Sequence, residues 1–137
     1  MWQPWASLVA MGVKRIEVRS WQTAYRGDLL IHASLRKPPR RMAAYYESAT
    51  YFKNYIHNVN HLPYGAIIGQ VRLTDIHSTD TLLMQPELFE GDRLRELAFD
   101  DFGPNRYGWM LDEARMFRYN LPMKGTLGLW DYDGLTE

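Results

Sequence analysis

Hydrophobic and polar positions alternate along residues 14–19, with the period of a β-strand that is buried on one face. Ile16 and Val18 form the apolar face, and charged residues lie between them. Successive side chains of a strand point to opposite faces, so the polar residues from position 17 onward share one face if the strand stays regular. That face carries Glu17, Arg19 and Trp21.

The pattern along the rest of the chain predicts strands separated by helices. Pro4 suits the first turn of a short helix over residues 5–11, which Gly12 ends. A long helix is expected after Pro38-Pro39, because apolar residues recur every three or four positions, and it should end near Pro63. Its apolar face comprises Met42, Tyr45, Ala49, Phe52, Ile56 and Val59. Further elements are strands at 28–33, 66–77, 108–119 and 125–132 and a short helix at 94–99.

These elements favour an α+β fold built on a small mixed β-barrel of about five strands. One long helix and one or two short helices accompany the strands, and closure of the sheet removes exposed edges. The length of 137 residues is typical of one domain, so a single domain is expected over residues 1–137.

Composition places the chain among ordinary globular proteins, with 46% hydrophobic and 23% charged residues. It has no cysteine, no apolar run long enough for a transmembrane helix and no secretory leader pattern, so no membrane association and a cytoplasmic location are expected. The net charge is zero, but residues 1–60 carry nine Lys/Arg and three Asp/Glu, whereas residues 61–137 carry seven and thirteen. This asymmetry fits either a surface that faces a polyanion or two halves that neutralise each other.

Lys14 and Glu17 are the candidate catalytic residues. A lysine near a carboxylate stays charged and can neutralise a phosphate or an oxyanion, while the carboxylate can accept a proton. The alternative is a structural salt bridge between the turn and the strand. Lys14 is expected to be partly exposed, so its loss should change stability by no more than about 1 kcal/mol.

Aromatic and basic residues supply candidate nucleic-acid contacts. Trp21, Tyr25 and Trp109 can stack on unpaired bases or pack in the core, where Trp5 and Trp130 are placed. Four cations surround the start of the predicted long helix, where a phosphate would relieve their conflict with the helix dipole, although a solvated basic corner is the alternative. The candidate basic contacts are Arg15, Arg19, Arg26, Arg36, Lys37, Arg40 and Arg41.

No metal-ligating residues are predicted. The four histidines lack a shared metal-ligand spacing, and His32 lies in an apolar strand, as a core histidine does. His57 and His61 stand one helical turn apart without a third ligand nearby. No cofactor is expected, although a divalent cation held by acidic residues is a weaker alternative. Those residues are Asp100 and Asp101 with Asp80 or Glu96.

Taken together, several motifs resemble the ASCH domain family, whose fold is similar to the RNA-binding PUA domain. The resemblance spans essentially the whole chain. It implies a pocket near the turn at Lys14, with nucleic acid or a nucleoside as ligand. The motif residues are Gln3 to Leu8, Gly12, Lys14, Glu17, Arg19, Trp21, Tyr25 to Gly27, Ile31 to Ala33, Gly65 to Val71, Tyr107 to Trp109, Lys124-Gly125 and Gly128 to Trp130.

The family resemblance also implies more than one activity: RNA binding, RNA cleavage, and hydrolysis of an acetylated cytidine amide. In the amidase-like branch the equivalent of Lys14 is catalytic and a threonine is the nucleophile, but Glu17 occupies that position here. Similar chains also carry several residues before the Gln-Pro-Trp motif. Only Met1 and Trp2 precede it here, so the family's first strand is expected to be missing or truncated.

The sequence therefore predicts a PUA-like domain with a cleft for single-stranded RNA or a nucleotide, framed by Lys14, Glu17, Arg19 and Trp21. RNA cleavage is an open further step. The alternative is a small amidohydrolase that acts on a modified nucleoside such as N4-acetylcytidine. A protein-interaction module is a third hypothesis, favoured only by the charge asymmetry. The sequence does not decide among RNA, DNA and a free nucleoside, and it leaves the oligomeric state open.

Overall fold

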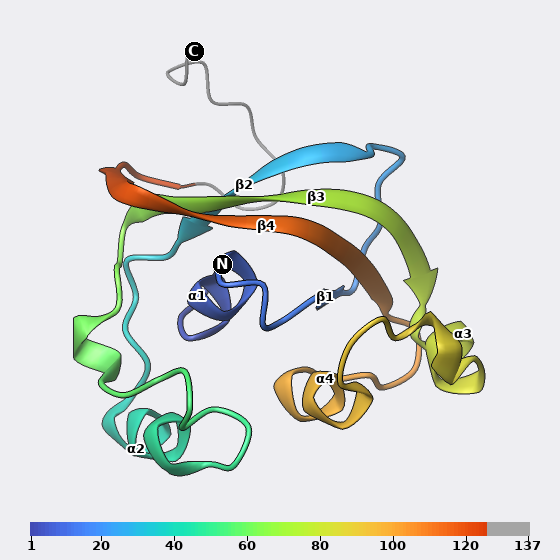
Figure 1. Ribbon diagram of the computed structural model, residues 1–137, viewed down its shortest axis with the longest axis horizontal. Coiled ribbons are helices and arrows are strands. Elements are labelled where there is room, and N and C mark those ends of the chain that lie inside the picture. Colours follow the sequence, from blue (N-terminus) through green and yellow to red (C-terminus); the bar gives the residue numbers. More distant parts are fainter. Residues whose placement is uncertain (126–137) are drawn as a thin grey trace.

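A four-stranded antiparallel sheet forms the centre of the computed structural model, which describes residues 1–125. The strand order is β1-β4-β3-β2, and every neighbouring pair is antiparallel. The long β3 and β4 run side by side and curve together (Figure 1). The strands are β1 (Ile16–Arg19), β2 (Gly27–Ala33), β3 (Ala66–Ser78) and β4 (Tyr107–Pro122).

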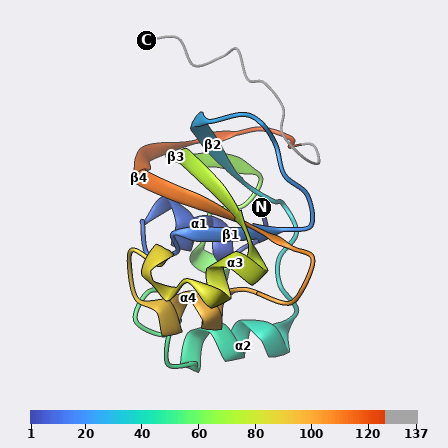
Figure 2. The same ribbon diagram turned by 90° about the vertical axis from the view of Figure 1, so that its right-hand side faces the viewer.

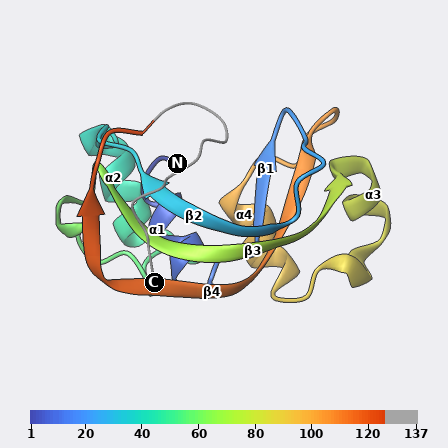
Figure 3. The same cartoon turned by 90° about the horizontal axis from the view of Figure 1, so that it is seen from above.

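Short helices lie on one side of this sheet. Figure 2 shows α1 directly against the strands and α2 at the greatest distance from them. In the view from above, β1 joins β4 near the end of the sheet where α3 and α4 lie (Figure 3). The helices are α1 (Trp5–Ala10), α2 (Arg40–Ser48), α3 (Thr79–Met84) and α4 (Arg93–Phe99), with 3-10 turns η1 (Val59–His61) and η2 (Pro86–Leu88).

The core follows from the apolar face of α1. Its small residues Ala6 and Ala10 let the helix approach the sheet, where Ile68 and Trp109 complete the first buried cluster. A second cluster lies between α1 and the segment around α2, and a third fixes β1 through Ile16. Burial of these apolar surfaces positions the turn that carries Lys14.

The predicted α+β class is confirmed, and four of the five predicted strands are present among residues 1–125, but the mixed barrel is wrong there because all pairings are antiparallel. The described sheet has four strands, and β1 and β2 are its edges. β4 continues to Pro122, past the predicted strand end at Tyr119. The predicted strand at 125–132 lies outside the described residues, except for its first position.

The predicted long helix from Pro38 to Pro63 is also wrong. Helix α2 ends at Ser48, whose hydroxyl donates to the carbonyl oxygen of Ala44 at 2.8 Å, and Ala49 is already extended. Phe52, Ile56 and Val59 are buried as the periodicity suggested, but they come from turns and from η1. The spacing of apolar residues therefore predicted which side chains are buried, but it did not predict the secondary structure that carries them.

The helices at residues 5–11 and 94–99 are confirmed as α1 and α4, while α3 was not predicted. Among the described residues, no helix is long and apolar enough to cross a membrane.

We expect Gly69→Ala to destabilise the fold because β3 and β4 are in close contact there. A Cβ atom at Gly69 would lie 2.6 Å from the carbonyl oxygen of Arg115 and 2.9 Å from the Cβ atom of Ala10. Overpacking of this kind costs roughly 1–3 kcal/mol of unfolding free energy, measurable by urea denaturation. Gly91→Ala is the control, since its nearest neighbour would be 3.6 Å away. Equal stability of the two variants would contradict this packing.

Candidate functional site

Lys14 is completely buried in the turn between α1 and β1. Gly12 ends α1 with a φ of +78°, and the Lys14 amide donates to the carbonyl oxygen of Leu8, so the local backbone directs the chain into β1. The ammonium group donates to Glu17 Oε1 at 3.0 Å, to Asp100 Oδ2 at 2.7 Å and to the carbonyl oxygen of Ile16. These three acceptors use all of its donors.

The charge of Lys14 is maintained by its two carboxylate partners. Burial by itself lowers the pKa of Lys14, but the charges and hydrogen bonds of Glu17 and Asp100 outweigh burial and raise the pKa above its ordinary value. Lys14 is therefore protonated at neutral pH and is not available as a proton acceptor there. The expectation that Lys14 is partly exposed is wrong.

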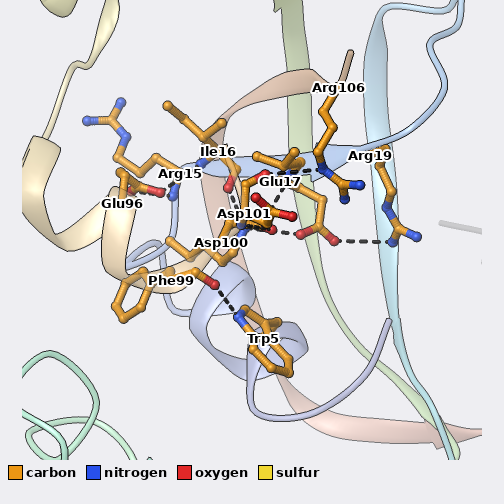
Figure 4. Close-up of polar contacts among 12 residues, drawn as sticks. Trp5, Arg15, Ile16, Glu17, Arg19, Glu96, Phe99, Asp100, Asp101 and Arg106 are labelled. Atoms are coloured by element: carbon orange, nitrogen blue, oxygen red, sulfur yellow. Dashed lines mark hydrogen bonds and ion pairs between the residues drawn. The ribbon is translucent and has the colours of Figure 1, made fainter. Parts of the chain in front are cut away.

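Asp100 is the partner that the sequence did not reveal. It directly follows α4, and its Oδ2 also accepts a hydrogen bond from the Val18 amide at 3.0 Å. Figure 4 shows Asp100 beside Glu17, although the two residues come from distant parts of the chain. We call Glu17 and Asp100 the carboxylate pair.

Helix α4 holds the outer edge of β1 through a second buried acid, Glu96 (Figure 4). Its carboxylate accepts from the amides of Arg15 at 2.9 Å and Ile16 at 3.2 Å. Desolvation raises the pKa of Glu96, although these hydrogen bonds and nearby cations oppose that effect. Glu96 and Asp100 thus provide the acceptors that a further strand would otherwise supply to this edge.

Arg19 continues the polar face of β1, whereas the strand ends there and Trp21 follows two residues later. Arg19 Nη2 lies 3.2 Å from Glu17 Oε2, so Glu17 contacts cations on both sides. Trp21 is 36% exposed and packs edge-to-face on Trp109, with ring centroids 4.8 Å apart. Trp109 itself is buried and donates to the carbonyl oxygen of Trp21, so its ring belongs to the core.

A cleft of about 980 Å³ opens above the carboxylate pair. Both side chains border it, with 12% and 16% of their surface exposed. Arg19 and Trp21 line the cleft near Glu17. Its remaining wall includes Trp2, Trp5, Leu35 and residues of β2.

Other predicted contacts lie at the rim of the cleft or away from it. The guanidinium of Arg36 lies 4.8 Å from the ring centroid of Trp2, and the ammonium of Lys37 lies 5.5 Å from that of Tyr64. Arg40 and Arg41 are exposed at the start of α2. These four cations form what we call the basic corner: Arg36, Lys37, Arg40 and Arg41.

Three further predicted residues, like the basic corner, do not line the cleft. Arg15 pairs with Glu90 and Asp112, at 3.0 and 3.3 Å. Tyr25 and Arg26 are exposed in the segment between β1 and β2, where each hydrogen-bonds to nearby backbone carbonyls.

Trp5 is only half buried, and its indole donates to the carbonyl oxygen of Phe99 at 2.5 Å, so it belongs to the cleft wall as well as the core (Figure 4). The other residue placed in the core, Trp130, lies outside the described residues.

No group of three acidic, histidine or cysteine side chains among the described residues is arranged to hold a metal ion. Two of the acids considered as cation ligands have other partners. Asp100 contacts Lys14, and Glu96 contacts the backbone at the start of β1. The ring of His32 hydrogen-bonds to the carbonyl oxygen of Met123 at 2.7 Å.

This arrangement defines a class of protein: a small α+β domain whose cleft lies over a lysine-bound carboxylate pair. The chain belongs to the ASCH domain family, which matches residues 1–116. This match confirms the resemblance that the sequence motifs indicated.

Relatives of the chain include much longer proteins. It is 39% identical over 133 residues to activating signal cointegrator 1 from Homo sapiens, which covers 96% of this chain and 21% of that protein. The Mus musculus protein of the same name is 38% identical over 77 residues, 55% of this chain and 13% of that protein. The chain therefore spans about a fifth or less of the length of these curated relatives.

Comparison with solved structures matches the chain to ASCH from Zymomonas mobilis. The match has 18% identity and a TM-score of 0.47, and it covers 89% of this chain and 69% of that one. A mutant of the same protein matches with 14% identity and a TM-score of 0.48 over 89% of this chain and 71% of that one.

Proposed function

We propose that this domain binds single-stranded RNA, with one unpaired base seated in the cleft against the carboxylate pair. The observation that carries this proposal is the composition of the cleft. It combines a polar floor with aromatic walls, and Arg36 of the basic corner lies over the ring of Trp2 in that wall. Membership of the ASCH family, whose fold is similar to an RNA-binding domain, supports the same ligand class.

The floor of the cleft suits a neutral base better than a phosphate. The charges of Lys14 and Arg19 balance those of Glu17 and Asp100, and both carboxylate side chains border the cleft. Carboxylates accept hydrogen bonds from the N–H groups of bases, as in contacts with the amino group of cytosine, but they repel phosphate oxygens. The base is therefore the part of a nucleotide that fits next to Glu17.

A phosphate fits beside Arg36, which contacts Trp2 in the cleft wall and has no acidic partner among the described residues. Among the ion pairs of residues 1–125, none involves Arg36, Lys37, Arg40 or Arg41. Cations of this kind bind the phosphate backbone of single strands without sequence preference. The affinity falls at higher salt, because salt cations compete for the phosphates. The basic corner thus complements a base held by the floor.

We expect Trp21→Ala to weaken RNA binding. Trp21 borders the cleft next to Glu17 and exposes part of its ring, so it can stack on the bound base. Loss of such a contact costs about 1–3 kcal/mol per base, which should appear in a titration of a fluorescent cytidine hexanucleotide at fixed ionic strength. Tyr119→Ala is the control, because Tyr119 is 73% exposed and does not line the cleft. Unchanged affinity of the Trp21 variant would reject a base at this position.

RNA cleavage is a second candidate function, in which the ribose instead of the base would lie next to Glu17, and the contact between Glu17 and Arg19 favours it. A carboxylate that faces the cleft can accept the proton of a ribose 2′-hydroxyl, and the oxygen can then attack the adjacent phosphorus. Arg19, 3.2 Å from Glu17, can stabilise the negative charge that develops on the phosphate oxygens. The leaving 5′-oxygen takes a proton from water. In this scheme Lys14 holds Glu17 in place and does not touch the substrate.

The amidohydrolase alternative has less support from the cleft. Its nucleophile in the resembling branch is a hydroxyl, whereas position 17 holds a carboxylate that is already bound by two cations. Lys14 has no unused donor and is protonated, so it cannot activate a nucleophile by accepting its proton.

A further inference from the structure

We infer that Trp2 forms a second stacking site, which holds the nucleotide adjacent to the one on the carboxylate pair. This inference rests on the proposed binding of single-stranded RNA. It extends the ligand of the cleft from one nucleotide to at least two. Trp2 was not among the contacts predicted from the sequence.

The position of Trp2 is fixed, although its side chain is exposed. Its carbonyl oxygen accepts a hydrogen bond from the Ala6 amide at 3.0 Å, and the following residue, Gln3, is buried and bonded to Ser7. The Trp2 side chain nevertheless remains 56% exposed and borders the cleft. A large aromatic ring held at the mouth of a cleft offers a stacking surface without much loss of conformational freedom on binding.

The guanidinium of Arg36 lies over one face of the Trp2 ring, so a base would stack on the opposite face, with its phosphate near this cation. Arg36 lies 4.8 Å from the Trp2 ring centroid, and neither Arg36 nor Lys37 has an acidic partner among the described ion pairs. A base stacked on Trp2 would therefore have its phosphate next to unpaired cations. Aromatic rings next to cations are the combination with which proteins bind single strands.

The size of the cleft agrees with two bases. Its volume of about 980 Å³ is at the upper end of the roughly 300–1,000 Å³ of clefts that hold a single small ligand. Trp21 lines the part of the cleft next to Glu17, whereas Trp2 and the exposed Leu35 line the part next to the basic corner. Of the four tryptophans that line the cleft, Trp21 and Trp2 are the exposed ones, one in each region.

The test compares ligands of different length on the wild-type chain and on Trp2→Ala. The probes are cytidine monophosphate, the cytidine dinucleotide and the cytidine hexanucleotide, with dissociation constants measured by calorimetry at one salt concentration. The wild type should bind the dinucleotide about 5- to 150-fold more tightly than the monophosphate, since one stacked base contributes roughly that factor. Trp2→Ala should lose this gain and keep its affinity for the monophosphate. Trp2→Phe, which retains an aromatic ring, should keep most of the gain.

Tyr119→Ala is the matched control. Tyr119 is an exposed aromatic residue with an arginine, Arg118, 5.6 Å from its ring centroid, but it does not line the cleft. Its loss should leave all three affinities unchanged. The inference is overturned if Trp2→Ala binds the dinucleotide as the wild type does, or if it weakens all three ligands equally. If the wild type binds none of the probes, the proposed function itself fails and the inference fails with it.

Discussion

Replacing Lys14 with methionine should lower the unfolding free energy by about 3–5 kcal/mol, the usual result of removing one partner from a buried ion pair. The ammonium is completely buried, and it lies 3.0 Å from Glu17 and 2.7 Å from Asp100. Without the ammonium group, the carboxylates of Glu17 and Asp100 would share a poorly solvated site and would no longer have a positive charge between them. Urea denaturation measures the change in unfolding free energy. It should be done at neutral pH, where Lys14 is protonated in the folded protein.

The neighbouring Arg15 provides the control for this result. Its guanidinium is 30% exposed and contacts Glu90 and Asp112, which are themselves exposed. Arg15→Met should therefore cost no more than about 1 kcal/mol. Adding Glu17→Gln and Asp100→Asn to the Lys14 variant should restore part of the lost stability, since both uncompensated charges are removed. Equal effects at positions 14 and 15 would show that the buried cation is not important for folding.

The size of this effect could not be predicted from the sequence, which led us to expect a partly exposed lysine. The salt bridge to Glu17 is local, three residues along the chain, and the spacing suggested it. The contact with Asp100 joins residues 86 positions apart. Only the packing of α4 against β1 makes Lys14 the centre of a three-residue cluster.

The strands at positions 14–19, 28–33 and 66–77 could be predicted because alternation depends on the two faces of the sheet alone. The segment after Ser48 shows where such patterns fail. Phe52 and Ile56 keep helical spacing, yet turns bring them into the core, since burial requires only that the side chains point inward. Sequence periodicity therefore located the buried residues of this segment without identifying its secondary structure.

The candidate site, too, could be predicted from the sequence only in part. Glu17 and Arg19 could be placed on one face because they belong to one strand, and Trp21, two residues beyond it, still lines the same cleft. Trp2 and Asp100 reach the cleft from other elements, and no local motif connects them with β1. Arg15 belongs to the same segment as Glu17, but it contacts Glu90 and Asp112 instead of the cleft.

Helix α4 links the stability of the domain to the geometry of the cleft. Glu96 and Asp100 accept hydrogen bonds from three backbone amides at the outer edge of β1, and Asp100 also contacts Lys14. The position of the Glu17 carboxylate thus depends on a helix that lines the cleft only through Asp100, the residue that follows it. This arrangement explains why variants of Lys14 and Asp100 have to be checked for folding before their ligand binding is compared.

Glu17→Gln should separate RNA cleavage from simple binding more clearly than any other variant. If Glu17 accepts the proton of the 2′-hydroxyl, the amide should lower turnover by about 10²- to 10⁴-fold, because it keeps the shape of the side chain but cannot take up the proton. Affinity for the RNA should hold or rise slightly, since a negative charge near the phosphates is lost. Cleavage and binding of one labelled hexanucleotide measure both quantities on the same sample.

Two further variants decide what the result means. Glu90→Gln removes a carboxylate that is 69% exposed and lies away from the cleft, so it should leave cleavage and binding unchanged. Glu17→Thr introduces the hydroxyl of the amidase-like branch, and release of acetate from N4-acetylcytidine by this variant alone would favour that chemistry for the cleft. A wild type that binds RNA without cleaving it would limit the domain to binding. A loss of binding in Glu17→Gln without any change in turnover would contradict the proposed role of Glu17 as the proton acceptor, because the carboxylate would then act on the bound base and not on the 2′-hydroxyl.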